Sequence, residues 1–119
     1  MVGKIEGCPL VDAMQVLSGR WRLVIVYRLL DGPKRFSDLQ RDIPKISRRM
    51  LAFDLKKLEE RCVVSRTVYA EVPTRVEYEL TDKGFGLRPV IDHLAQWGRS
   101  IGNRTPKVTT SQPNLSIAE

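Results

Sequence analysis

Three side chains spaced for one face of a helix carry the first chemical signal in this sequence. Arg49, Phe53 and Lys56 are separated by four and three residues, which on a helix places them within about 60° of one another. An arginine on such a face can donate two hydrogen bonds to guanine O6 and N7, and an aromatic ring can contact a thymine methyl group. A solvated basic face has the same pattern, and Phe53 could instead fold back against a core.

Residues beside this face suit the backbone of a nucleic acid. Serine and arginine side chains at the start of a helix are typical ligands of phosphate oxygens. Arg75 flanks a predicted hairpin, from which it could reach the minor groove or a phosphate. The predicted DNA-contacting residues are Ser37, Ser47, Arg48, Arg49, Phe53, Lys56, Lys57 and Arg75.

Two short helices are expected to position these side chains. The segment from Ser37 to Gln40 predicts a capping box, in which Ser37 accepts from the Gln40 N–H, and the helix it starts ends before Pro44. Ser47 is expected to cap a longer helix reaching about Arg61. The inner face of this helix is expected to be a buried apolar stripe of three leucines and one cysteine: Leu51, Leu55, Leu58 and Cys62.

A hairpin follows this pair of helices directly. Residues 65–69 are rich in strand formers, residues 75–80 alternate between apolar and polar types, and residues 70–74 connect them. Two helices joined by a short turn and followed by a hairpin form a winged helix-turn-helix. The predicted fold class is therefore mostly α with a small β-hairpin wing.

Further helices are expected on both sides of this unit. Pro9 can start a short first helix, residues 20–30 predict a central core helix, and residues 34–36 a short extended piece. Thr81 can cap a last helix, with a kink near Pro89. Residues 1–102 are expected to form one DNA-binding and dimerisation domain, and residues 103–119 a flexible tail.

The charge distribution agrees with a nucleic-acid partner. The chain has 20 Lys and Arg against 14 Asp and Glu, and the whole excess lies between residues 20 and 75. There is no apolar run of membrane-spanning length and no signal peptide, so a cytoplasmic location without a membrane partner is expected. Two distant cysteines and one histidine form no zinc-ligand spacing, and no catalytic, metal or cofactor site is predicted.

The sequence resembles the HxlR family of bacterial and archaeal regulators over about residues 8 to 99. The likeness is carried, in order, by Cys8-Pro9, Gly19-Arg20-Trp21, the run from Leu30 to Leu39, Ile46-Ser47, Met50-Leu51, Leu58-Glu59, Val68-Tyr69, Val72-Pro73, the run from Arg75 to Tyr78, Leu80-Thr81, Gly84 and Trp97-Gly98. This resemblance implies a winged-helix homodimer that binds double-stranded DNA and represses or activates nearby genes, with the terminal helices forming the dimer interface.

The apolar residues of the terminal helices agree with that implied interface. The alternative is that the last helix only caps its own core. The predicted interface residues are Val11, Val90, Ile91, Leu94, Trp97 and Ile101.

Two positions depart from the family pattern. Ala52-Phe53-Asp54 stands where polar residues and an arginine are frequent, so the target sequence cannot be inferred from relatives. Cys62 stands where a glycine usually closes the recognition helix. Having cysteine instead of glycine would lower the stability of the fold by about 1 kcal/mol if the backbone there is left-handed.

Cys8 matches a cysteine that some family members use to sense oxidants or electrophiles. Its place before a helix would let the helix dipole stabilise a thiolate. The alternative is an inert cysteine buried under the dimer interface. Cys62 is a conceivable disulfide partner from the other subunit.

Other functions remain open on the sequence alone. Winged helices can also serve as protein-interaction modules, bind double-stranded RNA, or bind DNA non-specifically as architectural proteins. Salt would separate the first of these from DNA binding, because contacts to several phosphates weaken steeply as salt rises.

Overall fold

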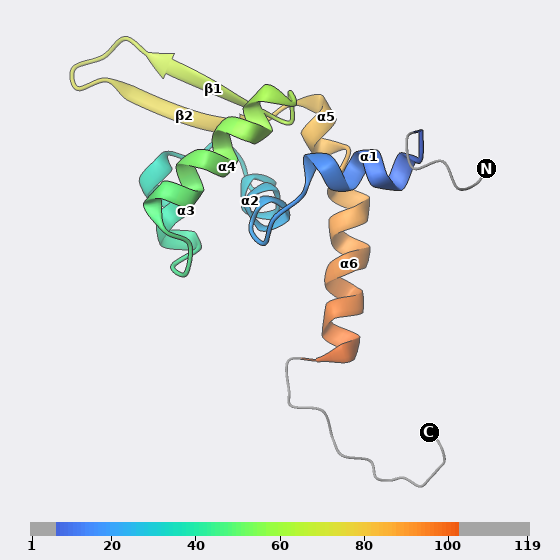
Figure 1. The fold of residues 1–119 in the computed structure, drawn as a ribbon. Coiled ribbons are helices and arrows are strands. Elements are labelled where there is room, and N and C mark those ends of the chain that lie inside the picture. Colours follow the sequence, from blue (N-terminus) through green and yellow to red (C-terminus); the bar gives the residue numbers. More distant parts are fainter. Residues whose placement is uncertain (1–6, 103–119) are drawn as a thin grey trace, which may run out of the picture.

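The computed structural model describes residues 7–102, and the predicted tail lies outside that range. Figure 1 shows six helices and one hairpin in this part of the chain. Their bounds are α1 Pro9–Val16, α2 Arg22–Leu29, α3 Phe36–Asp42, α4 Arg48–Glu60, β1 Val64–Tyr69, β2 Arg75–Leu80, α5 Asp82–Phe85 and α6 Arg88–Ile101. The mostly helical fold with a two-stranded wing is the predicted fold class.

The core lies between α2, α3, α4 and the base of the hairpin. Helix α2 buries three of its eight residues, as expected of a central helix, and α4 buries its leucine stripe against it. Burying these side chains holds the inner face of α4, which leaves its other face free. The buried apolar residues are Ile25, Val26, Leu29, Leu39, Ile43, Ile46, Leu51, Leu55, Leu58, Val63, Val64, Leu80 and Ile91.

The N-terminal cap predicted for α4 is confirmed, and the one predicted for α3 is not. Ser47 caps α4 as expected, its Oγ accepting from the Met50 N–H at 3.0 Å. The predicted capping box of α3 is wrong. The helix begins at Phe36, and the Asp38 carboxylate accepts from the Arg35 N–H at 3.1 Å. The chain enters α3 earlier because Lys34 is already fixed in a β-bridge.

An isolated β-bridge extends the hairpin on the outer side of β2. Strands β1 and β2 pair antiparallel from Val64 opposite Leu80 to Tyr69 opposite Arg75. On the other side of β2, Lys34 and Tyr78 exchange two backbone hydrogen bonds of 2.9 and 2.8 Å. The extended piece predicted at residues 34–36 is therefore confirmed for Lys34 and Arg35 only, because Phe36 already belongs to α3. The bridge anchors the segment before α3 to the wing.

Helix α4 ends in a Schellman motif. The Val63 N–H donates to the Leu58 carbonyl and the Cys62 N–H to the Glu59 carbonyl, both at 3.0 Å. Cys62 has a left-handed backbone with φ +63°, as its family position suggested. The expected burial of Cys62 is wrong, since its side chain is exposed. The helix ends at Glu60, so the chain turns away before the stripe reaches the cysteine.

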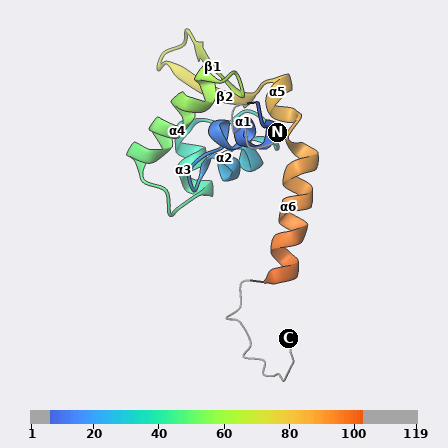
Figure 2. The same ribbon diagram turned by 45° about the vertical axis from the view of Figure 1, so that its right-hand side comes forward.

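The predicted last helix is two helices. Thr81 caps α5 as expected, accepting from the Gly84 N–H at 3.2 Å. The helix is interrupted between Phe85 and Arg88, next to Pro89, which lies in the first turn of α6. Figures 1 and 2 agree that α6 projects from the rest of the molecule beyond its first turns. A long helical face is therefore left without a partner among residues 7–102.

Candidate nucleic-acid interface

The outer face of α4 gathers the central residues of the predicted DNA-contacting set. Arg49, Phe53 and Lys56 are all exposed, and Phe53 keeps 51% of its surface accessible. Ser47, Arg49, Met50 and Phe53 line an open hollow of about 450 Å³ at the start of the helix. The phenyl ring therefore faces outward, and the alternative that it folds into the core does not hold.

Two cations flank the exposed aromatic ring. The Arg22 guanidinium lies 5.9 Å and the Lys57 ammonium 5.5 Å from the centre of the Phe53 ring. These separations fall within the range of cation–π attraction. Lys57 also pairs with Glu60 at 3.6 Å, which offsets part of its charge. The flanking cations restrict how Phe53 is presented on the surface.

Arg48 and Ser37 lie where α3 meets α4. The Arg48 guanidinium donates to the Gln40 side chain at 3.3 Å and stacks over the Phe36 ring at 5.1 Å. These contacts join the two helices of the motif. Ser37 is exposed in the first turn of α3, where its hydroxyl is accessible to a phosphate.

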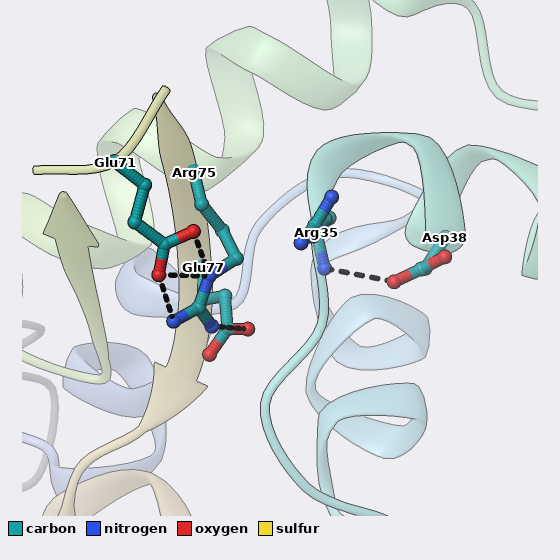
Figure 3. A network of polar contacts seen from close by, with 5 residues as sticks. All are labelled: Arg35, Asp38, Glu71, Arg75 and Glu77. Carbon is teal, nitrogen blue, oxygen red and sulfur yellow. Dashed lines mark hydrogen bonds and ion pairs between the residues drawn. The ribbon is translucent and has the colours of Figure 1, made fainter. Parts of the chain in front are cut away.

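Arg75 is held in a cluster with acidic residues. Its guanidinium bonds the Glu71 carboxylate at 2.8 Å and pairs with Glu77 (Figure 3). It also stacks over the Tyr69 ring, 3.8 Å from the ring centre. The hydrogen bond from Arg75 lowers the pKa of Glu71, and bonds to Glu71 and Glu77 raise the pKa of Arg75. The sequence did not anticipate this pairing. A phosphate contact by Arg75 would have to compete with two carboxylates.

A buried ion pair behind α4 was missed in the sequence. Asp54 is 3% exposed, and its carboxylate accepts from Arg22 Nε at 3.0 Å. The same guanidinium donates to the Val16 carbonyl at 3.3 Å and approaches the Ser18 hydroxyl at 3.4 Å. The unusual Asp54 was the only signal, and nothing in the sequence identified Arg22 as its partner.

The residues predicted for a dimer interface divide into two groups. Ile91 is 4% exposed and packs into the core of its own chain, and Val11 is half-buried. Val11 lines a groove of about 700 Å³ beside α1. The other four are exposed along α6, with 45 to 60% of their surface accessible: Val90, Leu94, Trp97 and Ile101.

Cys8 occupies the N-cap position of α1. It is half-buried, and its carbonyl accepts from the Asp12 N–H at 3.0 Å. Within residues 7–102, no three His, Cys, Asp or Glu side chains gather in an arrangement that could hold a metal ion. None of the helices described is long and apolar enough to cross a bilayer.

Comparison with known proteins agrees with this arrangement. The family model for an HxlR-like helix-turn-helix matches residues 16–106. The uncharacterized HTH-type transcriptional regulator YdeP of Bacillus subtilis is 40% identical over 107 residues, which are 90% of this chain and 84% of the relative.

Two solved structures extend the likeness to redox-related regulators. The redox regulator HypR in its oxidized form is 39% identical, with a TM-score of 0.76 over 83% of this chain and all of the other. The reduced form of the transcriptional regulator YodB from B. subtilis is 43% identical, with a TM-score of 0.68 over 76% of this chain and 89% of the other. The chain belongs to the HxlR-like helix-turn-helix family of DNA-binding transcriptional regulators.

Proposed function

We propose that this protein is a transcriptional repressor that binds a pseudo-palindromic operator as a homodimer in the cytoplasm. The observation that carries the proposal is the outer face of α4, where Arg49, Phe53 and Lys56 are exposed while the leucine stripe is buried. A recognition helix needs its inner face held by the core and its N-terminal outer face free to reach base edges. Arg49 is assigned to a guanine edge and Phe53 to a thymine methyl group.

The projecting helix α6 supports the homodimer. Its exposed apolar side chains form a stripe that water would have to cover in a monomer. A second copy related by a two-fold axis would bury both stripes and present the two α4 helices to the two half-sites of one operator. The operator half-sites are then expected about one helical turn, or a multiple of it, apart.

The first test is a titration of the full chain against DNA from its own upstream region, with random DNA as competitor. Binding that survives the competitor and gives a dimer footprint is the expected result. Equal, salt-sensitive binding to both DNAs would indicate an architectural DNA binder. Binding to neither would indicate a protein-interaction module, and preference for RNA in direct competition would indicate an RNA-binding function.

Arg49→Gln tests the base contact itself. The loss of a bidentate contact to guanine is expected to reduce discrimination between operator and random DNA by about 1–3 kcal/mol. Arg88→Gln is the matched control, because Arg88 is exposed at the start of α6 and changes the net charge equally. An Arg49→Gln variant that keeps full discrimination would contradict the assignment of Arg49.

We also propose that oxidation at Cys8 alters operator affinity. Two observations support it: Cys8 is the half-buried N-cap residue of α1, and the chain is 39% identical to the redox regulator HypR in its oxidized form. Exposed Cys62 is the candidate partner in a disulfide, which would release two electrons and two protons to a thiol oxidant such as diamide. If Cys8→Ser left the response of DNA binding to diamide unchanged, sensing through Cys8 would be excluded.

A further inference from the structure

A second hollow lies between α4 and the wing, and Lys56 belongs both to its lining and to the predicted DNA-contacting face. It measures about 330 Å³ and is lined by Ala52, Lys56, Glu59, Arg66 and Tyr78. Figure 1 shows α4 running beside the base of the hairpin, so both elements contribute to its walls. The small side chain of Ala52 leaves the space open on the helix side.

The sheet register directs Arg66 toward this hollow. Arg66 on β1 lies opposite Tyr78 on β2, and directly opposed residues point to the same face of a sheet. Both backbone groups of Tyr78 bond to Lys34 on the other edge. The pair with Arg66 is therefore of the non-hydrogen-bonded kind, in which the two side chains lie closer together.

The hollow offers donors of the kind that bind phosphate. Lys56 and Arg66 are both exposed, and neither forms a salt bridge within residues 7–102. The half-buried phenol of Tyr78 adds a third donor. Glu59 is the one acidic residue of the lining, and its charge opposes an anion. With two cations and one carboxylate, the lining residues carry a net charge of +1.

We propose that this hollow holds one phosphate of the DNA backbone, bound by Arg66 and Lys56, when α4 lies in the major groove. The inference rests on the DNA binding proposed above and deepens it. Arg66 becomes a DNA-contacting residue that the sequence did not reveal. Lys56 is assigned to the backbone instead of a base edge, so it positions the protein and does not read sequence.

The test is the salt dependence of DNA affinity in the full chain. Arg66→Gln is expected to weaken binding to operator and random DNA alike, and to reduce the slope of log affinity against log salt by about 0.9. Between about 50 and about 200 mM salt, the loss of affinity would shrink roughly 3-fold. Arg88→Gln, with the same change in net charge, should leave the slope unchanged, and thermal unfolding of both variants should match that of the parent chain.

Two further variants, Glu59→Gln and Lys56→Gln, test the other charged residues of the lining. Glu59→Gln should tighten binding with no change in slope, because it removes a repulsion and adds no phosphate contact. Lys56→Gln should weaken binding to all sequences. A loss of discrimination by Lys56→Gln would overturn its assignment to the backbone.

The outcomes separate this inference from the proposed function. An Arg66→Gln variant with the slope and affinity of the parent chain refutes the phosphate site while leaving DNA binding intact. A parent chain that binds no DNA refutes both.

Discussion

Cys62 adopts a left-handed backbone conformation, φ +63°, at the C-terminal end of the recognition helix. A side chain with a Cβ is strained in this region, by about 1–2 kcal/mol, and glycine is the residue that avoids the strain. The Cys62 side chain is exposed, so it recovers little of that cost through packing. The Schellman hydrogen bonds and the buried contact of Val63 with the core hold the conformation in place.

Cys62→Gly is expected to raise the free energy of unfolding by about 1 kcal/mol, because the strain outweighs the extra freedom that glycine gives the unfolded chain. Chemical denaturation would measure the change. Cys62→Ser is the control: it removes the thiol, keeps the Cβ, and should leave stability unchanged. Equal stability of the glycine variant and the parent would show that the position is unstrained.

The lowered pKa of Glu71 predicts a local pH response of the wing. Because Arg75 bonds the carboxylate, the folded pKa lies below the unfolded value of about 4.3. The contact is therefore fully present above the unfolded pKa and is lost as pH falls through the folded pKa. NMR titration should show the pKa of Glu71 rising toward its ordinary value in Arg75→Gln. An unchanged Glu71 titration in that variant would mean that the ion pair does not persist in solution.

At the scale of elements, the Arg22–Asp54 pair ties α4 to α2 and to the end of α1. The two side chains are 11% and 4% exposed, so removal of one partner leaves a charge largely out of water. Asp54→Ala is expected to lower the free energy of unfolding by about 3 kcal/mol. Arg22→Met combined with Asp54→Leu should recover most of this loss, since a well-packed apolar pair can replace a buried ion pair.

Denaturation of the single and double variants measures this coupling. Glu60→Ala is the surface control, because its pair with Lys57 is about half exposed and is expected to contribute less than about 1 kcal/mol. If Asp54→Ala costs no more than Glu60→Ala, the pair does not anchor the recognition helix.

At the scale of the whole molecule, α6 extends from the domain (Figure 2), and its apolar stripe is exposed within residues 7–102. If this stripe forms the homodimer, Trp97→Asp is expected to shift the protein to monomer in sedimentation experiments, because it places a charge in a desolvated interface. Val68→Asp is the control: Val68 is similarly exposed, at 53% against 60%, and lies on the wing. A Trp97→Asp variant that remains dimeric would place the interface elsewhere.

Most of the helices and strands could be predicted from the sequence, because their signals lie in neighbouring residues. The start of α3 and the break between α5 and α6 were the exceptions. The Ser47 and Thr81 caps, the strand at residues 75–80 and the periodicity of α4 are local signals, and the structure confirms them. The predicted alternation of β2 is not seen in its burial, because Arg75, Val76, Glu77 and Tyr78 are all half-buried. The exposed group of Arg49, Phe53 and Lys56 followed from helical geometry alone.

Tertiary structure decided the contacts between segments. The partners Arg22 and Asp54 are 32 residues apart, and only the packing of α2 on α4 brings them together. Arg66 and Lys56 line the same hollow because β1 packs beside α4. A Cβ at Gly84 would clash with the Val63 carbonyl oxygen, which lies 21 residues earlier in the chain. Such distances depend on how the elements pack, which local propensity and periodicity do not specify.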